Sequence, residues 1–573
     1  MPDTSDAWPL RSLLLAVVGA AVALAVQQLV AVAPGGPPTG NAHLALATLL
    51  AVGGVAFGFV VERTRLHWSL GFAAAAGTVI AAVVYWNGGW GYPDNWRLVC
   101  AALTVAIAAP LFQAWRDARA PGAPRFALAY PAVHDHAWTN VLLFLAALLF
   151  VGIVWLLMFL LSALFNLIGI DLVQRLLRND QFGAVLVGGA FGGAVGLLRD
   201  RSAVIGTLQR VVMTILSVLA PVLAAGLLLF LLALPFTGLA PLWQATKSTT
   251  PILLSCIIGA LLLINAVIGD RPEEVSRLAL LRWAAAVLAL AMLPLAAIAA
   301  VSTGLRINQY GLTPDRLWAL VFIGFAKAYG LAYLLALLRA RGGWPVRVRI
   351  ANLRLAVALC GVALLLSTPL INFGAISTRD QLARLASGRT PADKFDWSAL
   401  RFDFGASGEA AVKRLVTEGK TPEIRAAAAV AMKEQDRYRM RGLPANRSVA
   451  VGIEERLIIL PKTAALPKVL RSDLSWNVNC TKTVRCLLYV EPDEASATLV
   501  GRTGGVGEIF VVTYYVGKDG WSYTKPAEPI TESERKANEA RLVAAFTARQ
   551  LEIRTVERRQ VFIGGEAVGY PFE

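Results

Sequence analysis

Charged residues are scarce in this chain, and residues that carry catalytic chemistry are scarcer still. Charged side chains make up 16% of the 573 residues, against about 25% in typical soluble domains. The chain has four histidines, none after residue 136, and five cysteines. It contains no P-loop, no serine-centred nucleophile elbow and no paired Cys/His set with zinc-site spacing. These absences argue against a water-soluble enzyme of a common hydrolase or nucleotide-binding class, and we expect no cofactor.

Apolar runs are what the sequence has in excess. Hydrophobic residues make up 56% of the chain and are concentrated before residue 374. A bilayer core about 30 Å thick needs roughly 20 apolar residues in a helix, because lipid offers no hydrogen-bond partner to the backbone. We expect about eleven transmembrane helices, at 13–33, 43–61, 69–86, 98–114, 138–167, 182–198, 211–234, 250–268, 278–301, 317–338 and 355–373.

The predicted fold is therefore an α-helical polytopic membrane bundle at 1–374, followed by a soluble α+β domain at 375–573. In the second part, Ser377 or Thr378 can cap a helix that runs to Gly388. Thr421-Pro422-Glu423 has the cap, first-turn proline and acidic residue of another helix start. Helices are expected near 407–418, 421–440 and 531–548, and strands at 456–460, 484–490, 508–516 and 560–563.

Arginine and lysine are shared unevenly between the loops of the bundle. Arg11 and alternate loops carry about 17 of them, whereas the intervening loops carry about 6. Cytoplasmic loops retain Arg and Lys, so we predict a cytoplasmic N-terminus. An odd number of spans then places the C-terminal domain outside the cytoplasm. The same rule accounts for most of the net charge of +16, so the expected partner is the lipid bilayer and not a nucleic acid.

Two cysteines bear independently on this orientation. Cys480 and Cys486 bracket a short Thr-Lys-Thr-Val-Arg segment between two apolar runs, as a disulfide that closes a short hairpin would. Disulfides persist in oxidising compartments such as the periplasm, so we predict the bridge and a periplasmic tail. The alternative is two unrelated cysteines.

Lys327 is the sharpest single candidate for a functional residue. It lies near the midpoint of the 317–338 span, where a cation is costly unless it faces a partner, water or a ligand. Tyr329 and Tyr333 are one turn apart and supply hydroxyls, so an anion or proton site inside the bundle is one interpretation. The other is a structural lysine held by carbonyls or reaching the interface. Asn166 and Asn265 are candidates for hydrogen bonds between helices.

His134-Asp135-His136 precedes the fifth span and could bind a metal ion. A metal site needs three or four converging ligands, and this motif supplies at most three. A cap at the start of a helix is the alternative, and we expect no metal.

Four segments together resemble a known family. They are Leu234–Leu239, Pro241–Thr250, Asn265–Asp270 and Phe165–Ile170. Over roughly residues 130–405 the chain is similar to the bacterial multi-pass membrane proteins classed as domain of unknown function 4153. The resemblance implies a protein of the inner membrane of a Gram-negative-type cell, and it carries over no catalytic residues.

Three functions are compatible with these features. The first is an envelope scaffold or sensor that presents a periplasmic domain to an envelope protein or a small molecule. The second is a transporter or channel with its site around Lys327. The third is an integral-membrane enzyme acting on an envelope substrate. A polar cavity at Lys327 would favour the second, and a lipid-sized groove with carboxylates would favour the third.

Overall fold

The computed structural model describes most of the first 434 residues and parts of the remainder. The described residues are 8, 10–31, 39–87, 95–119, 128–238, 249–392, 394–434, 437, 456–461, 464, 466, 470, 474, 480, 485–490, 496–502, 509–517, 520–524, 559–563 and 566–572. The chain divides into two compact units. We call residues 1–387 with 400–411 the membrane unit, and residues 388–399 with 412–573 the tail unit.

Eleven helices of the described residues are long and apolar enough to cross a bilayer, which confirms the predicted membrane bundle. They are α1 (Arg11–Val30), α2 (Asn41–Val60), α3 (Leu66–Asn87), α4 (Asn95–Asp117), α5 (Tyr130–Leu167), α7 (Asp180–Asp200), α8 (Ser202–Thr237), α10 (Thr249–Ile268), α11 (Ala279–Tyr310), α12 (Pro314–Ala340) and α13 (Trp344–Ser367). A six-residue helix, α6 (Leu172–Leu177), lies between α5 and α7.

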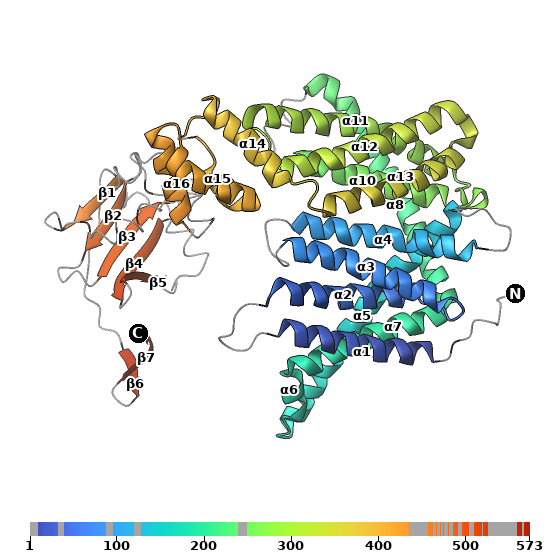
Figure 1. Cartoon of the computed structure of the whole chain (residues 1–573), viewed down its shortest axis with the longest axis horizontal. Helices are drawn as coiled ribbons and strands as arrows, with labels where there is room; N and C mark the ends of the chain where they lie inside the picture. Colours follow the sequence, from blue (N-terminus) through green and yellow to red (C-terminus); the bar gives the residue numbers. More distant parts are fainter. Residues whose placement is uncertain are drawn as a thin grey trace. The chain divides into compact units, whose positions relative to one another are not determined.

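The packing of the membrane unit has two centres. Figure 1 shows α1, α2, α3 and α4 side by side in chain order, and α1 also packs against α7. The larger buried core is formed by α8, α10, α11, α12 and α13, with Ile264, Leu288 and Met292 fully buried in it. A smaller core joins α1, α2, α4, α5 and α7.

Glycine allows α1 and α7 to approach at backbone distance. A Cβ placed on Gly188 would lie 2.2 Å from the carbonyl oxygen of Gly19, and one on Gly192 would lie 2.0 Å from that of Leu15. Such separations are far shorter than any real contact of a methyl group, so only glycine fits. Small residues at a helix interface are the usual route to close packing in membranes.

The last membrane helix is shifted from its predicted position. The sequence predicted a span at 355–373, whereas α13 begins at Trp344 and ends at Ser367. Pro369 explains the end, because the residue before a proline is driven out of helical conformation, and Thr368 is extended. The following helix, α14 (Phe373–Ala386), is capped by Asn372, whose side chain accepts from the Ala375 N–H. The predicted cap at Ser377 or Thr378 is therefore wrong.

The tail unit combines helices with a small sheet, as predicted. The helices are α15 (Gly405–Glu418), which begins in the membrane unit, and α16 (Pro422–Lys433), which Thr421 caps as expected. Strands β1 (Leu457–Leu460), β2 (Cys486–Val490), β3 (Ser496–Arg502), β4 (Ile509–Gly517) and β5 (Gly520–Thr524) form one sheet in this order. Strands β6 (Arg559–Ile563) and β7 (Glu566–Phe572) form a separate pair. The helix predicted at 531–548 lies outside the described residues.

The predicted disulfide is confirmed. Cys480 and Cys486 are bonded, and their Cα atoms lie 5.3 Å apart, within the ordinary range for such a bridge. Both are buried in the core that carries Leu470, Leu488 and Leu499. In the sheet, β2 pairs with β1, which is parallel to it, and with β3. The hairpin predicted around the bridge lies outside the described residues. The bridge fixes Cys480 to the first residue of β2.

The close approach of α1 and α7 gives the first testable prediction. Gly192→Ala should lower the free energy of unfolding by about 2 kcal/mol, because the added methyl must push two backbones apart. Gly152→Ala on α5 is the matched control, since its Cβ meets nothing within 4 Å. The control should change stability by less than about 1 kcal/mol. Thermal unfolding of the detergent-purified protein measures both, and equal melting temperatures for the two variants would contradict the packing described.

Candidate functional site

A network of buried and partly buried polar side chains joins four membrane helices near one end of the membrane unit. Asn265 on α10 donates to the Tyr333 hydroxyl on α12 at 2.9 Å, and Tyr333 donates to Asn352 Oδ1 on α13 at 2.9 Å. Asn352 in turn donates to Asn265 Oδ1 at 2.7 Å and to the hydroxyl of Tyr130, the first residue of α5, at 3.4 Å. Tyr333 is fully buried.

The network is closed on itself. Each amide and the Tyr333 hydroxyl both donates and accepts, and Asn265 also donates to the Leu261 carbonyl at 2.7 Å. Groups that are already paired have little capacity to hold a ligand, so the geometry indicates a structural joint between helices. The structure thus brings together Tyr333 and Asn265, two of the candidates from the sequence.

Sequence reasoning missed the other two members. Asn352 precedes the predicted span at 355–373, and Tyr130 precedes the one at 138–167, so both fall outside the predicted helices. Both helices begin earlier, at Trp344 and Tyr130. A proline at the second position of each helix was the available signal for these starts.

The remaining intramembrane candidates lie elsewhere. Lys327 is exposed on α12, so it does not line an enclosed polar site with Tyr333. Tyr329 is half-buried, and its ring lies 6.4 Å from that of Tyr333 without joining the network of hydrogen bonds described above. Asn166, near the end of α5, is exposed and donates to Gln174 Oε1 on α6 at 3.3 Å.

Next to the network lies a cluster of one histidine and two carboxylates. Ligand atoms of His134, Asp135 and Asp270 all lie within 4.8 Å of one another. His134 is one turn beyond Tyr130 on α5, and the two rings are 5.6 Å apart. Asp270 comes two residues after α10 ends and is 4% exposed. The cluster is therefore assembled from the start of α5 and the end of α10.

Arg349 on α13 holds the Asp270 loop in place. Its guanidinium donates to the carbonyls of Ile268 at 2.6 Å, Gly269 at 3.1 Å and Arg271 at 2.8 Å. These are carbonyls at and beyond the C-terminus of α10, where no helical partner remains and a positive charge is favourable. Gly269 has φ +60, and a Cβ there would lie 2.5 Å from that of Glu274.

Arg271 is the cation nearest the two carboxylates. It forms ion pairs with Asp135 at 3.4 Å and Asp270 at 3.5 Å, and its side chain is 58% exposed. The charges of Asp270 and Asp135 raise the pKa of Arg271, so it remains cationic. Long ion pairs of an exposed side chain contribute little stability.

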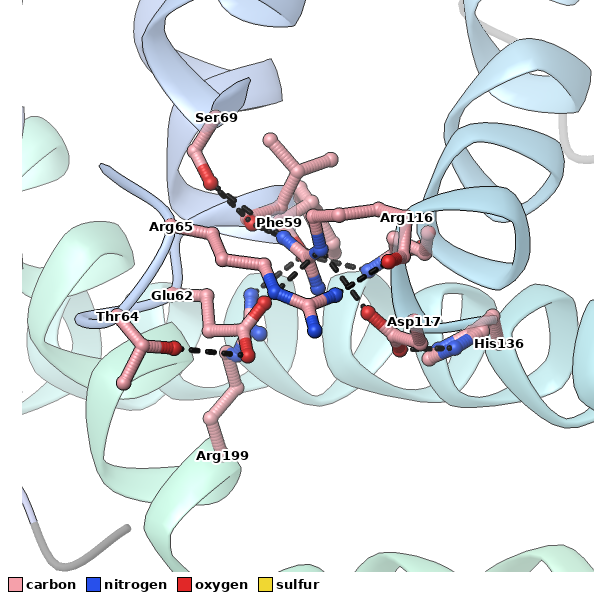
Figure 2. A network of polar contacts seen from close by, with 11 residues as sticks. Phe59, Glu62, Thr64, Arg65, Ser69, Arg116, Asp117, His136 and Arg199 are labelled. Atoms are coloured by element: carbon pink, nitrogen blue, oxygen red, sulfur yellow. Dashed lines mark hydrogen bonds and ion pairs between the residues drawn. The ribbon is translucent and has the colours of Figure 1, made fainter. Parts of the chain in front are cut away.

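The His-Asp-His motif does not act as one unit. Side chains two residues apart on a helix point about 200° from each other, so His134 and His136 diverge. His136 lies 3.0 Å from Asp117 at the end of α4, in a different network (Figure 2). The three residues of the motif therefore do not converge. His134 and Asp135 lie close to Asp270, which is distant in sequence, whereas His136 does not.

Figure 2 shows the network that His136 joins, around the C-terminus of α2. Arg116 is almost fully buried and donates to the Val60 carbonyl at 2.6 Å, while its Nε lies 2.9 Å from carboxylate oxygens of Glu62 and Asp117. Ser69 donates to the same Val60 carbonyl at 2.9 Å.

Two further arginines complete this network. Arg199 from α7 donates to the carbonyls of Gly58, at 3.0 Å, and Phe59. Arg65 donates to the carbonyl of Arg116. These contacts satisfy carbonyls that the end of α2 leaves free, and they tie α2, α3, α4, α5 and α7 together at one end. The arrangement is that of a helix cap shared between helices.

An apolar cavity of about 790 Å³ lies between α1, α2, α5 and α7. Leu15, Val22 and Phe144 are among its lining residues, and Gln27, Asn179 and Asp180 add polar groups. Asn179 already caps α7 by accepting from the N–H groups of Gln181 and Phe182. Asp180 is the one carboxylate among the described residues that line it. The cavity has the size and polarity for an acyl chain but lacks the paired carboxylates of an acid–base site.

The network at Tyr333 gives the second prediction. Tyr333→Phe should lower the free energy of unfolding by about 1 kcal/mol, because the lost hydroxyl leaves polar groups of Asn265 and Asn352 less well paired. Tyr329→Phe, one turn away, is the control and should be nearly neutral. Thermal unfolding of the detergent-purified variants measures both. A larger loss of stability for Tyr329→Phe than for Tyr333→Phe would refute the structural role assigned to the network.

Comparison with known proteins agrees with the resemblance seen in the sequence. A search among curated proteins found no match, and a search among solved structures found none. A family model described as "Domain of unknown function (DUF4153)" matches residues 45–415, which extends the region of resemblance in both directions. The match covers more than half of the chain, and the chain belongs to this family of domain of unknown function 4153.

Proposed function

We propose that this protein is a scaffold or sensor of the bacterial inner membrane, in which the bundle at 1–374 holds a periplasmic domain at 375–573. The disulfide between Cys480 and Cys486 is the observation that carries the proposal. A disulfide in the core of a folded unit persists in the periplasm and is rare in the reducing cytosol. The tail would bind an envelope protein or a small molecule there.

The distribution of arginine supports the same orientation. Five arginines that the positive-inside rule places on the cytoplasmic side make polar contacts with helix ends or loops of the membrane unit: Arg11, Arg116, Arg199, Arg271 and Arg349. Networks that share the first turns of α5 connect four of them at one end of the unit. We call this the arginine-rich end. Cytoplasmic ends of membrane proteins carry such residues. Eleven crossings from a cytoplasmic N-terminus lead to the opposite side.

The two alternatives have less support. A transporter centred on Lys327 requires a polar cavity around that residue, whereas Lys327 is exposed on α12 and the buried polar side chains nearby bond to one another. An enzyme acting on an envelope lipid is favoured by the cavity of about 790 Å³, but Asp180 alone among its described lining residues is a carboxylate.

Reporter fusions test the orientation. Alkaline phosphatase joined after Glu573 should be active, because that enzyme needs the oxidising periplasm, and a green fluorescent protein exported unfolded to the same place should stay dark. The matched control is a pair of fusions after Gly342, between α12 and α13, which should give the opposite result. An inactive phosphatase after Glu573, with fluorescence there, would reverse the proposed topology.

Thiol counting tests the disulfide in cells. After free thiols are blocked and the protein is denatured, reduction should expose two new thiols per chain, from Cys480 and Cys486. Cys486→Ser should abolish this gain, whereas Cys256→Ser should leave it unchanged, because Cys256 is a free cysteine of α10. Mass spectrometry of the labelled protein measures the count. Five thiols blocked without reduction would mean a reduced tail and would remove the main support for a periplasmic domain.

A further inference from the structure

We propose that His134, Asp135 and Asp270 form a binding site for a divalent transition-metal ion at the arginine-rich end of the membrane unit. The site goes beyond the proposed role of the tail and does not depend on it. Its ligands come from the start of α5 and from the loop that follows α10.

The donor atoms already lie close together. One imidazole nitrogen and one oxygen from each carboxylate are all within 4.8 Å of one another. Metal–ligand bonds of about 2.0–2.2 Å place neighbouring ligands roughly 3.0–3.6 Å apart, so small side-chain rotations suffice to close the set. His134 and Asp270 are 136 positions apart in the sequence, so the packing of α5 against the end of α10 brings them together.

Buried polar atoms without hydrogen-bond partners support a cation-binding role for this cluster. Both ring nitrogens of His134 are buried and have no hydrogen-bond partner among the described residues. The side chain of Asp270 is 4% exposed, and its Oδ2 has no hydrogen-bond partner among them either; its contact is the long ion pair with Arg271 Nε at 3.5 Å. Buried polar atoms are nearly always hydrogen-bonded, because leaving one unpaired costs about 1–3 kcal/mol. A cation between His134 and Asp270 would pair both at once.

The backbone around Asp270 is held in advance. Three carbonyls of residues 268–271 accept hydrogen bonds from Arg349, and the Asp270 N–H donates to Glu274 Oε2 at 3.2 Å. A loop fixed in this way aims the Asp270 carboxylate at a constant position. Preorganised ligands lose less conformational entropy when they bind an ion.

The guanidinium of Arg271 would compete with a metal ion for the two carboxylates. Its guanidinium spans Asp135 and Asp270 at 3.4 and 3.5 Å, but the side chain is 58% exposed and can turn outward into solvent. An incoming ion would replace one positive charge by two at the same carboxylates. Arg271 should therefore weaken metal binding and not assist it.

The donor set suggests the class of ion. Imidazole favours Zn²⁺ and other late transition metals, and carboxylate oxygen favours Mn²⁺, Mg²⁺ and Ca²⁺. One imidazole with two carboxylates fits Zn²⁺ best and Mn²⁺ next, and three protein ligands leave a coordination position for water.

Calorimetric titration of the chelator-treated, detergent-purified full chain with Zn²⁺ tests the site. One ion should bind per chain. His134→Ala and Asp270→Asn should each weaken the affinity by roughly 100-fold or more, beyond the effect of losing an outer-shell partner. His136→Ala is the matched control and should keep wild-type affinity, because His136 lies against Asp117. Asp135→Asn, at a half-exposed position, gives a further variant if the others fail to fold.

Arg271→Met supplies a test with the opposite sign. Removing the competing guanidinium should strengthen Zn²⁺ binding several-fold, and Zn²⁺ should raise the melting temperature of this variant and of the wild type but not of Asp135→Asn. The proposal is overturned if the wild type binds no stoichiometric Zn²⁺, if Asp135→Asn binds as tightly as the wild type, or if His136→Ala loses binding equally. Weaker binding by Arg271→Met would also contradict it.

Discussion

Lipid cannot accept or donate hydrogen bonds, and this constraint governs the membrane unit beyond the helices themselves. A helix leaves its last carbonyls without partners, so each helix end near the bilayer needs donors from elsewhere. At the end of α2, Arg116, Arg199 and Ser69 supply them, and at the end of α10 Arg349 supplies three hydrogen bonds. Arginines at the arginine-rich end therefore cap helices of the bundle.

The first residues of α5 connect these two capping systems. His136 lies against Asp117 in the network around α2, whereas Asp135 pairs with Arg271 beyond α10. Tyr130, one turn earlier than His134, reaches Asn352 and Asn265 in the bundle. One short stretch of helix therefore contacts both packing centres. The His134-Asp135-His136 motif is thus divided in the structure: two of its three residues lie with Asp270, and His136 lies with Asp117.

Hydropathy and cysteine spacing were enough to predict the number of spans and the disulfide, because both are local features of the sequence. The partners of Tyr333 were not predictable in this way. Asn352 and Tyr130 fall outside the predicted spans, since the apolar window begins after the true start of each helix. The depth of Lys327 in its span left open whether it faces a site or has a structural role, because its exposure depends on which side of α12 packs inward, and that is decided by neighbours far away in sequence. The pairing of His134 with Asp270 is equally non-local.

The proposed ion site and the hydrogen-bond network at Tyr333 both connect α5 to α10. Asp270 follows α10, the helix that carries Asn265, and His134 stands one turn from Tyr130 on α5. An ion that draws His134 towards Asp270 acts on the same pair of helices that Tyr130 and Asn265 already join, at 3.4 Å. Since a packed core deforms little, tightening one contact between two helices constrains the next contact along them. A metal ion bound by His134 and Asp270 would therefore restrict the relative motion of α5 and α10. The hydrogen bonds at Tyr333 would extend this restriction to α12 and α13.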